Sequence, residues 1–189
     1  SALGMPAWWE IDVMKFLTVQ TAGPAAMASL IREEPPGLRE ARASLSELLA
    51  EARRLGGGGG GATLTSKQLL IGGFSQGAMT SLDLALHQPA GETPAGVVFL
   101  SGAPIVVEQW AERLPLHKDM PVFISHGHAD PTLPFVASGW VHELLKQHEL
   151  PVEYNTHTGG HTLGDDNIVR RLTSFVSARV SASGQPSVG

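Results

Sequence analysis

One stretch constrains the fold of this chain more than any other: residues 69–78, with the sequence Leu-Leu-Ile-Gly-Gly-Phe-Ser-Gln-Gly-Ala. An apolar run leads directly into Gly-Phe-Ser-Gln-Gly, and the residues that follow repeat their apolar positions at helical spacing. A strand, a sharp turn with serine at its apex and a helix form the arrangement called a nucleophile elbow. We expect Gly73 and Gly77 to occupy positions where a side chain would collide with neighbouring backbone, with Ser75 standing clear of the sheet.

The serine motif alone is weak evidence, because the chain contains 22 glycines and a chance match to Gly-x-Ser-x-Gly is common in such a sequence. Its context is more specific, since a β-type run precedes the motif and an amphipathic helix follows it directly. In that context the backbone N–H of Gln76 lies in the first turn of the helix. It can then point at an oxyanion that forms beside Ser75.

The rest of the chain alternates short apolar runs with helical patterns. Further strands are expected at residues 96–101, 121–126 and 151–156, and further helices at 38–55, 134–148 and 165–182. This alternation predicts an α/β fold with a mostly parallel sheet and helices on both faces. A length of 189 residues favours a single domain over residues 1–189, with a flexible Gly-rich loop at 55–63 and a disordered tail at 183–189.

Composition narrows the classes of partner and location. The net charge is −5, and Lys and Arg never cluster beyond pairs, so we expect no nucleic-acid partner. Cysteine is absent, which excludes disulfides, thiolate metal sites and cysteine catalysis. No apolar run approaches the length of a membrane span, so no stable membrane insertion is expected. A cytoplasmic location is the simplest expectation, although the sequence starts at Ser1 and a removed signal peptide would also fit.

Serine is a poor nucleophile until a base takes its proton, and histidine is the usual base because it titrates near neutral pH. The imidazole in turn needs a carboxylate that fixes its tautomer. Such groups follow the carboxyl ends of parallel strands, and in α/β-hydrolases the acid and then the base follow the serine along the chain. Asp130 lies in the loop after residues 121–126, and His161 lies in the loop after residues 151–156. We therefore predict a catalytic triad of Ser75, Asp130 and His161.

Other acidic and histidine side chains compete for these roles. Asp83 lies one or two helical turns beyond the serine and is expected to be solvated or to cap a helix, while Asp165 and Asp166 look like an N-cap for the last helix. Four histidines are expected at the surface: His87, His117, His142 and His148. His126 and His157 stay open as alternative bases, although a histidine at the end of a strand is more often a packed, hydrogen-bonded residue.

A metal site is the alternative interpretation of the segment from His126 through His128 to Asp130. Closely spaced His-x-His-x-Asp can bind zinc, but the segment lacks an evident fourth ligand. We expect neither a metal nor an organic cofactor, because the serine mechanism needs none.

Apolar residues beside the motif loops are candidates for a substrate pocket. They are Met79, Trp110, Leu133 and Phe135, and core packing is the alternative for each of them. The pair Trp8 and Trp9 lies beside a proline in a segment without a clean period, which indicates a packed loop. These tryptophans form either an aromatic clamp on the surface or a wall of a substrate channel.

Taken together, the motifs resemble those of one known family. They are Gly-Phe-Ser-Gln-Gly at 73–77, Leu-Ser-Gly at 100–102, His-Gly-His-Ala-Asp-Pro at 126–131 with Pro-Phe at 134–135, Gly-His at 160–161 and Met-Pro-Ala-Trp-Trp-Glu-Ile at 5–11. Over about residues 4 to 176 the chain is similar to the phospholipase/carboxylesterase family of α/β-hydrolases, which includes the acyl-protein thioesterases. The resemblance implies an α/β-hydrolase fold and the triad Ser75, Asp130 and His161. It also implies hydrolysis of carboxylic esters, lysophospholipids or thioesters of acylated proteins.

One departure from the family pattern concerns the oxyanion hole. Family members carry opening strands and a His-Gly-x-Gly-Asp-like loop upstream of the Met-Pro-x-Trp stretch, and that loop supplies the second oxyanion donor. The sequence contains no such segment, so we expect an N-terminally truncated fold with the Gln76 N–H as the only donor, and one lost donor costs about 10²–10³ in rate. The strand at 69–74 would then be an open apolar edge. A cleaved N-terminal fragment or a second copy of the chain, as a homodimer, is expected to cover it.

These inferences lead to one predicted function with two alternatives. The prediction is a serine carboxylic-ester hydrolase that forms an acyl-enzyme from a small ester, a thioester or a lipid-like acyl substrate. A non-catalytic or weakly active binding module would keep the triad but lack a complete oxyanion hole. An acyltransferase would pass the acyl group to an acceptor other than water.

Overall fold

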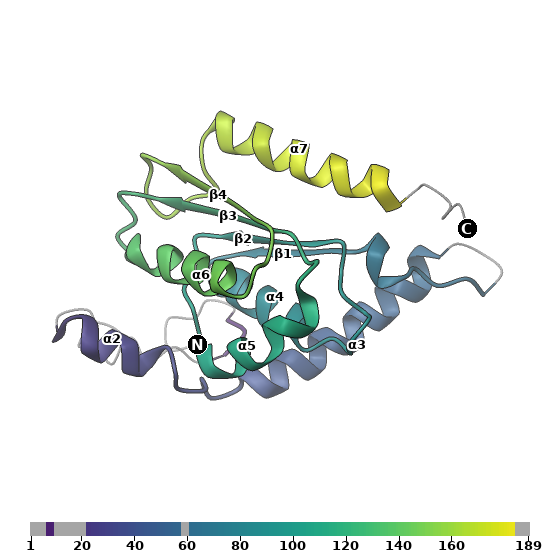
Figure 1. The fold of residues 1–189 in the computed structure, drawn as a ribbon, viewed down its shortest axis with the longest axis horizontal. Coiled ribbons are helices and arrows are strands. Elements are labelled where there is room, and N and C mark those ends of the chain that lie inside the picture. The colour runs from purple at the N-terminus through teal and green to yellow at the C-terminus, as the bar shows by residue number, and fades with distance from the viewer. Residues whose placement is uncertain (1–6, 10–21, 58–60, 184–189) are drawn as a thin grey trace.

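The computed structural model of the protein describes residues 7–9, 22–57 and 61–183 (Figure 1). Its centre is a sheet of four parallel strands, which lie side by side in chain order. The strands are β1 (Leu70–Phe74), β2 (Gly96–Leu100), β3 (Val122–Gly127) and β4 (Val152–His157). The predicted strands are therefore confirmed, with bounds that differ from the expected ones by at most two residues.

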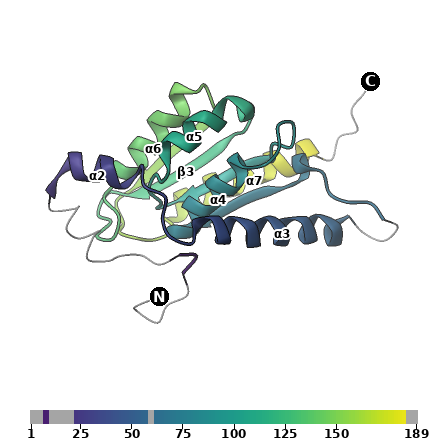
Figure 2. The same ribbon diagram turned by 90° about the horizontal axis from the view of Figure 1, so that it is seen from below.

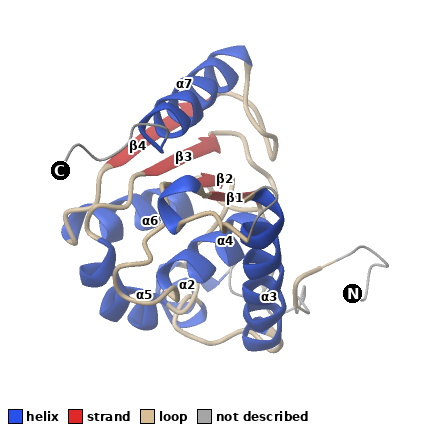
Figure 3. Ribbon diagram, turned by 90° about the vertical axis from the view of Figure 1, so that its right-hand side faces the viewer, coloured by secondary structure: helices blue, strands red, loops and turns tan. Residues whose placement is uncertain are grey.

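Helices connect the strands and cover both faces of the sheet. They are α2 (Pro24–Leu30), α3 (Leu38–Gly56), α4 (Gln76–Leu86), α5 (Val107–Arg113), α6 (Val136–Gln147) and α7 (Asp166–Ser183), with the short 3₁₀ helices η1 (Ser66–Gln68) and η2 (Leu114–His117). Because adjacent strands follow one another along the chain, right-handed crossovers place α4, α5 and α6 on the same face. Helix α7 follows the last strand and covers the opposite face (Figure 3). The predicted α/β fold is confirmed.

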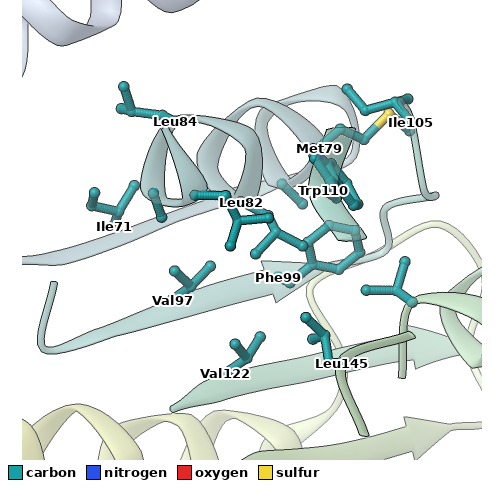
Figure 4. Close-up of a cluster of buried hydrophobic side chains, with 14 of the residues drawn as sticks. Ile71, Met79, Leu82, Leu84, Val97, Phe99, Ile105, Trp110, Val122 and Leu145 are labelled. Atoms are coloured by element: carbon teal, nitrogen blue, oxygen red, sulfur yellow. The ribbon is translucent and has the colours of Figure 1, made fainter. Parts of the chain in front are cut away.

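The main core lies between the sheet and the helices α4, α5 and α6 (Figure 4). Val97 and Phe99 of β2 meet Leu82 of α4 and Trp110 of α5 in this core, and none of the four has exposed surface. Side chains of a strand alternate between the two faces, so Val98 packs instead against the smaller cluster under α7. Burial on both faces explains why β2 is a continuous apolar run in the sequence.

The sequence patterns do not reveal α2 and α5, which have only seven residues each. Two helical turns are too few for an apolar period to stand out. Helix α3 corrects the expected boundary of the Gly-rich loop 55–63, because Leu55 and Gly56 belong to its last turn. Residues 58–60 of that loop and 184–189 of the expected tail lie outside the described residues. Among the helices that are described, none combines the length and the apolar character that crossing a membrane requires.

Helix α7 begins with the expected cap. Asp165 Oδ1 accepts the backbone N–H groups of Asn167 and Ile168, each at 3.0 Å. These are N–H groups of the first turn that have no partner within the helix. The prediction that this acidic pair caps the last helix is therefore confirmed for Asp165.

Asp83 corrects another expectation, because its side chain is fully buried rather than solvated. Arg42 of α3 donates to Asp83 through Nε at 2.6 Å, and Trp110 of α5 donates through Nε1 at 3.0 Å. Helix α3 runs beside α4 (Figure 2), so these hydrogen bonds join three helices. The expectation is wrong because the partner Arg42 lies 41 residues earlier in the chain, beyond any local pattern.

Substitution of Asp83 by alanine is expected to lower the free energy of unfolding by about 3–5 kcal/mol. The Arg42 guanidinium, on a side chain that is 17% exposed, and the indole N–H of Trp110 would lose their acceptor. Urea denaturation measures the change, provided that the m value stays constant. Glu51→Ala is the matched control, because it breaks the exposed pair of Glu51 with Arg54 on α3 and should change stability far less. Equal losses in the two variants would contradict the prediction.

His117 also departs from expectation, since it lies in the interior with 1% of its surface exposed. Its Nδ1 pairs with Thr93 Oγ1 at 2.9 Å, and its Nε2 pairs with the carbonyl oxygen of Leu86 at 3.1 Å. Burial lowers the pKa of His117, although the hydrogen bond to Leu86 acts in the opposite direction. A neutral imidazole with both nitrogens paired thus joins η2 to the end of α4.

Candidate active site

The turn between β1 and α4 carries backbone strain. Ser75 has φ 57° and ψ −124°, a conformation that residues other than glycine rarely adopt. A Cβ on Gly73 would lie 2.4 Å from the backbone of Gly77, so only glycine fits at position 73. The atom nearest to a Cβ on Gly77 would be Trp8 Nε1, at an ordinary contact distance of 3.7 Å. The steric expectation therefore holds for Gly73 and is wrong for Gly77.

Three side chains from three loops meet beyond the carboxyl ends of the strands. Ser75 follows β1, Asp130 follows β3 and His161 follows β4. Ser75 Oγ lies 2.9 Å from His161 Nε2, and His161 Nδ1 lies 2.7 Å from Asp130 Oδ2. The side chain of Asp130 is fully buried, whereas that of His161 is 18% exposed. A hydroxyl, an imidazole and a carboxylate are thus in contact, in that order.

The carboxylate of Asp130 is held at both oxygens. Oδ1 accepts the backbone N–H groups of Thr132 at 2.8 Å and Leu133 at 2.9 Å, while Oδ2 faces His161. Burial raises the pKa of Asp130, but the hydrogen bonds from Leu133, His161 and Thr132 outweigh it and hold the pKa below its ordinary value. An ionised carboxylate can only accept, so Nδ1 of His161 carries the hydrogen. The other nitrogen, Nε2, is then left to accept the hydroxyl hydrogen of Ser75.

The end of β2 links the serine loop to the histidine loop. The N–H of Ser75 donates to the carbonyl oxygen of Leu100 at 2.8 Å, and the hydroxyl of Ser101 donates to the carbonyl oxygen of Thr162 at 3.1 Å. Ser101 is buried and has φ 47°, in the left-handed region. Sequence reasoning assigned Ser101 no role. The available signal was a Ser-Gly pair at the carboxyl end of a predicted strand, at the edge where ligands of α/β sheets bind.

Gln76 has a main-chain N–H at the start of α4, and its side chain forms hydrogen bonds with the backbone of Trp8 and Trp9. The side chain of Ser75, the N-cap residue of α4, makes no cap hydrogen bond and so leaves the backbone N–H groups of the first turn able to donate. The side-chain oxygen of Gln76 accepts the N–H of Trp8 at 2.8 Å, and its amide donates to the carbonyl oxygen of Trp9 at 3.1 Å. Trp9 is buried in the core, whereas Trp8 is 46% exposed. Packing is therefore the role of Trp9, while Trp8 lies at the surface beside the elbow.

The four candidate pocket residues differ in exposure. Trp110 has no exposed surface and donates to Asp83, so it belongs to the core and is not a pocket wall. Met79 is 8% exposed and packs in the same core (Figure 4). Leu133 is 7% exposed, and Phe135 is partly exposed. Among these four residues, Phe135 thus has the most surface available to a substrate.

The histidines of the alternative assignments do not share the surroundings of His161. They are His126 and His157, the alternative bases, and His128 of the alternative metal site. His126 is fully buried and pairs through Nε2 with the carbonyl oxygen of Leu133 at 3.1 Å. His157 is buried as well. His128 packs its ring 4.1 Å from that of Phe135. Within the part of the chain that the structure describes, no group of three or more His, Asp or Glu side chains is arranged to hold a metal ion.

Comparison with known proteins finds one family and several relatives. A sequence model of the phospholipase/carboxylesterase family matches residues 2–179. Acyl-protein thioesterase 1 of Neurospora crassa is 27% identical over 162 residues, which cover 84% of this chain and 59% of that protein. Acyl-protein thioesterase 1 of Schizosaccharomyces pombe is 29% identical over 139 residues, which cover 73% and 52%. The chain thus spans between about half and three fifths of the length of these curated relatives.

Solved structures extend the likeness to three dimensions. SOBER1 of Arabidopsis thaliana superposes with a TM-score of 0.68 and 21% identity, over 93% of this chain and 75% of that chain. Esterase PE8 superposes with a TM-score of 0.65 and 24% identity, over 75% of this chain and 61% of that chain. At these identities the likeness establishes the fold, which is that of the α/β-hydrolases.

Proposed function

Because this chain belongs to the phospholipase/carboxylesterase family, we propose that it is a serine carboxylic-ester hydrolase with Ser75 as nucleophile, His161 as base and Asp130 as the carboxylate that orients and stabilises His161. The observation that carries the proposal is the pair of contacts made by His161, 2.9 Å to Ser75 Oγ and 2.7 Å to Asp130 Oδ2. The strained backbone at Ser75 adds support, because such strain persists where the surrounding structure enforces it and clusters at functional sites.

Acylation begins when Oγ of Ser75 attacks the acyl carbon of the substrate while its proton passes to Nε2 of His161. The buried carboxylate of Asp130 stabilises the imidazolium through Nδ1–H. Negative charge develops on the acyl oxygen, and the backbone N–H of Gln76 is the proposed donor to it. As the tetrahedral intermediate collapses, His161 returns the proton to the departing alkoxide or thiolate. The products are an acyl-enzyme and an alcohol or thiol.

A water molecule completes the cycle. His161 takes a proton from water as the water oxygen attacks the acyl carbon of the Ser75 ester. As the second tetrahedral intermediate collapses, His161 returns this proton to Oγ of Ser75, which restores the hydroxyl and releases the carboxylic acid. Acylation and deacylation thus each combine proton transfer with acyl transfer, and Ser75, His161 and Asp130 take part in both.

The proposed substrate is an ester or thioester with an apolar acyl part. The two curated relatives are named acyl-protein thioesterases, and one matched structure is named an esterase. Exposed apolar side chains on the segments that carry or adjoin the reacting groups support this class: Trp8, beside Gly77, is 46% exposed, and Leu163, in the loop that carries His161, is 57% exposed. Apolar surface beside polar reacting groups favours an acyl chain over a charged group. Small esters, lysolipids and acylated protein thiols share this chemistry.

Labelling with a fluorophosphonate probe tests whether Ser75 is activated. Such a probe bonds to a serine whose proton is taken by a neighbouring base, so peptide mass spectrometry should find the adduct on Ser75 and not on Ser174, an exposed serine of α7. The same preparation should hydrolyse p-nitrophenyl esters, and prior labelling should reduce hydrolysis in proportion to the labelled fraction. A series of acyl lengths then identifies the chain that the site prefers.

Two results would overturn the proposal. A folded protein that takes no label at Ser75 would have no activated serine. Labelling without release of acid from any oxygen ester or thioester would indicate a binding module. If added alcohol or amine then gave an acylated product, acyl transfer would replace hydrolysis.

A further inference from the structure

A second histidine lies behind the carboxylate of Asp130. His126, in β3, has no exposed surface, and its Nε2 lies 3.3 Å from Asp130 Oδ2 and 3.1 Å from the carbonyl oxygen of Leu133. The same Oδ2 lies 2.7 Å from His161 Nδ1. One carboxylate oxygen is therefore close to two imidazoles, one beside Ser75 and one in the interior.

The surroundings of His126 fix its tautomer. A carbonyl oxygen only accepts hydrogen bonds, so Nε2 carries the hydrogen that it donates to Leu133. Nδ1 is buried and has no hydrogen-bond partner among the described residues. Burial lowers the pKa of His126, and this effect outweighs the Leu133 carbonyl and Asp130, which raise it. The neighbouring His161 and His157 lower the pKa further. His126 is thus a neutral imidazole with its N–H on the side of the carboxylate.

Leu133 links His126 to Oδ1, the other oxygen of the Asp130 carboxylate. Its N–H donates to Asp130 Oδ1 at 2.9 Å, and its carbonyl oxygen accepts from His126. The N–H of Thr132 donates to the same Oδ1 at 2.8 Å. Because His126 lies near the carboxyl end of β3, an interior strand of the sheet, it anchors the loop that holds Oδ1 and also faces Oδ2. Rotation of the carboxylate would disturb contacts at both oxygens.

We propose that His126 is a positioning residue for Asp130, which keeps the carboxylate in the orientation in which Oδ2 faces His161. The inference rests on the proposed function for its effect on the reaction rate. The orientation itself can be observed without turnover. In this role His126 neither gains nor loses a proton, which distinguishes it from His161.

Three substitutions distinguish the effect of the N–H donor of His126 from the effect of its packing. His126→Gln places an amide N–H close to the position of Nε2–H, whereas the shorter amide of His126→Asn does not reach Leu133. His126→Phe keeps an aromatic ring but has no donor, and it preserves the edge-on contact with Phe135, whose ring centroid lies 6.1 Å away. Thermal unfolding first establishes that each variant is folded. If His126→Phe does not fold, His126→Asn carries the comparison.

Two measurements report on the orientation of Asp130. The first is the low-field proton resonance of His161 Nδ1–H, whose position depends on its charge-assisted hydrogen bond to Asp130. It should match the wild type in His126→Gln and be weakened or moved upfield in His126→Phe and His126→Asn. The second is kcat/KM for a p-nitrophenyl ester, which should fall about 10- to 100-fold in His126→Phe and stay within about threefold of the wild type in His126→Gln.

The inference would be overturned if folded His126→Phe kept the wild-type resonance and rate, or if His126→Gln were as impaired as His126→Phe. A purely structural role predicts lower melting temperatures without any difference in resonance between His126→Gln and His126→Asn. Failure of the proposed function gives a different pattern, in which the wild type hydrolyses no ester and takes no probe. The resonance of His161 in the variants would still decide whether His126 positions Asp130.

Discussion

Replacing Ser75 by alanine is expected to lower kcat for ester hydrolysis by roughly 10⁶-fold, the loss that follows removal of the nucleophile from other serine hydrolases. Alanine keeps the Cβ and the backbone of the turn, so the fold should be unaffected, but no oxygen remains to attack the acyl carbon. Steady-state kinetics with a p-nitrophenyl ester measures the loss. Ser174→Ala is the matched control, because the exposed Ser174 hydroxyl donates to the carbonyl oxygen of Arg170 in its own helix, on the far side of the sheet from α4. It should retain wild-type activity.

The double variant Ser75→Ala, His161→Ala makes the test sharper. Its kcat should be close to that of Ser75→Ala alone. The hydroxyl and the imidazole act in the same step, so removing the imidazole after the hydroxyl causes little further loss of rate. Losses that multiply would mean that His161 acts independently of Ser75. A Ser75→Ala variant that keeps a substantial part of the activity would mean that another side chain attacks the ester.

The sheet and the meeting point of its loops could be predicted because both follow from local patterns. Strands that are buried on both faces give uninterrupted apolar runs, and helices of three or more turns give a recognisable period. Loops that follow parallel strands share one edge of the sheet. Ser75 and His161 therefore could be expected close together although 86 residues separate them in the chain.

Contacts that depend on distant partners could not be predicted in this way. A lone Asp83 in an amphipathic helix fits the surface equally well, and its burial is tolerable because Arg42 and Trp110, which belong to two other helices, donate to it. The same holds for His117, whose partner Thr93 lies 24 residues earlier. Local patterns also do not say whether His126, near the end of β3, or His128, in the loop that follows, faces inward, so the contact of His126 with Asp130 emerges only from the packed structure.

Substitution of Asp130 by asparagine is expected to lower kcat/KM by about 10⁴-fold, although the shape of the side chain is unchanged. The asparagine oxygen can still accept the N–H groups of Thr132 and Leu133, which hold Oδ1 at 2.8 and 2.9 Å. Its amide nitrogen then replaces Oδ2 and offers a hydrogen to Nδ1 of His161. His161 consequently carries its own hydrogen on Nε2, where it cannot accept the proton of Ser75. Kinetics of folded Asp130→Asn, with its His161 tautomer read from imidazole nitrogen shifts, measures both effects.

The pH dependence of stability separates loss of this carboxylate from general damage to the loop. Burial raises the pKa of Asp130, but its hydrogen bonds hold the pKa in the folded protein below the ordinary value. Such a carboxyl stabilises the fold at pH above its unfolded pKa, about 4, and loses that contribution as the pH falls through the lower folded pKa. Asp130→Asn has no such titration, so the advantage of the wild type in urea denaturation should be full at neutral pH and shrink in acid below pH about 4. An advantage that persists unchanged into acid, together with an active Asp130→Asn, would mean that a different carboxylate supports His161.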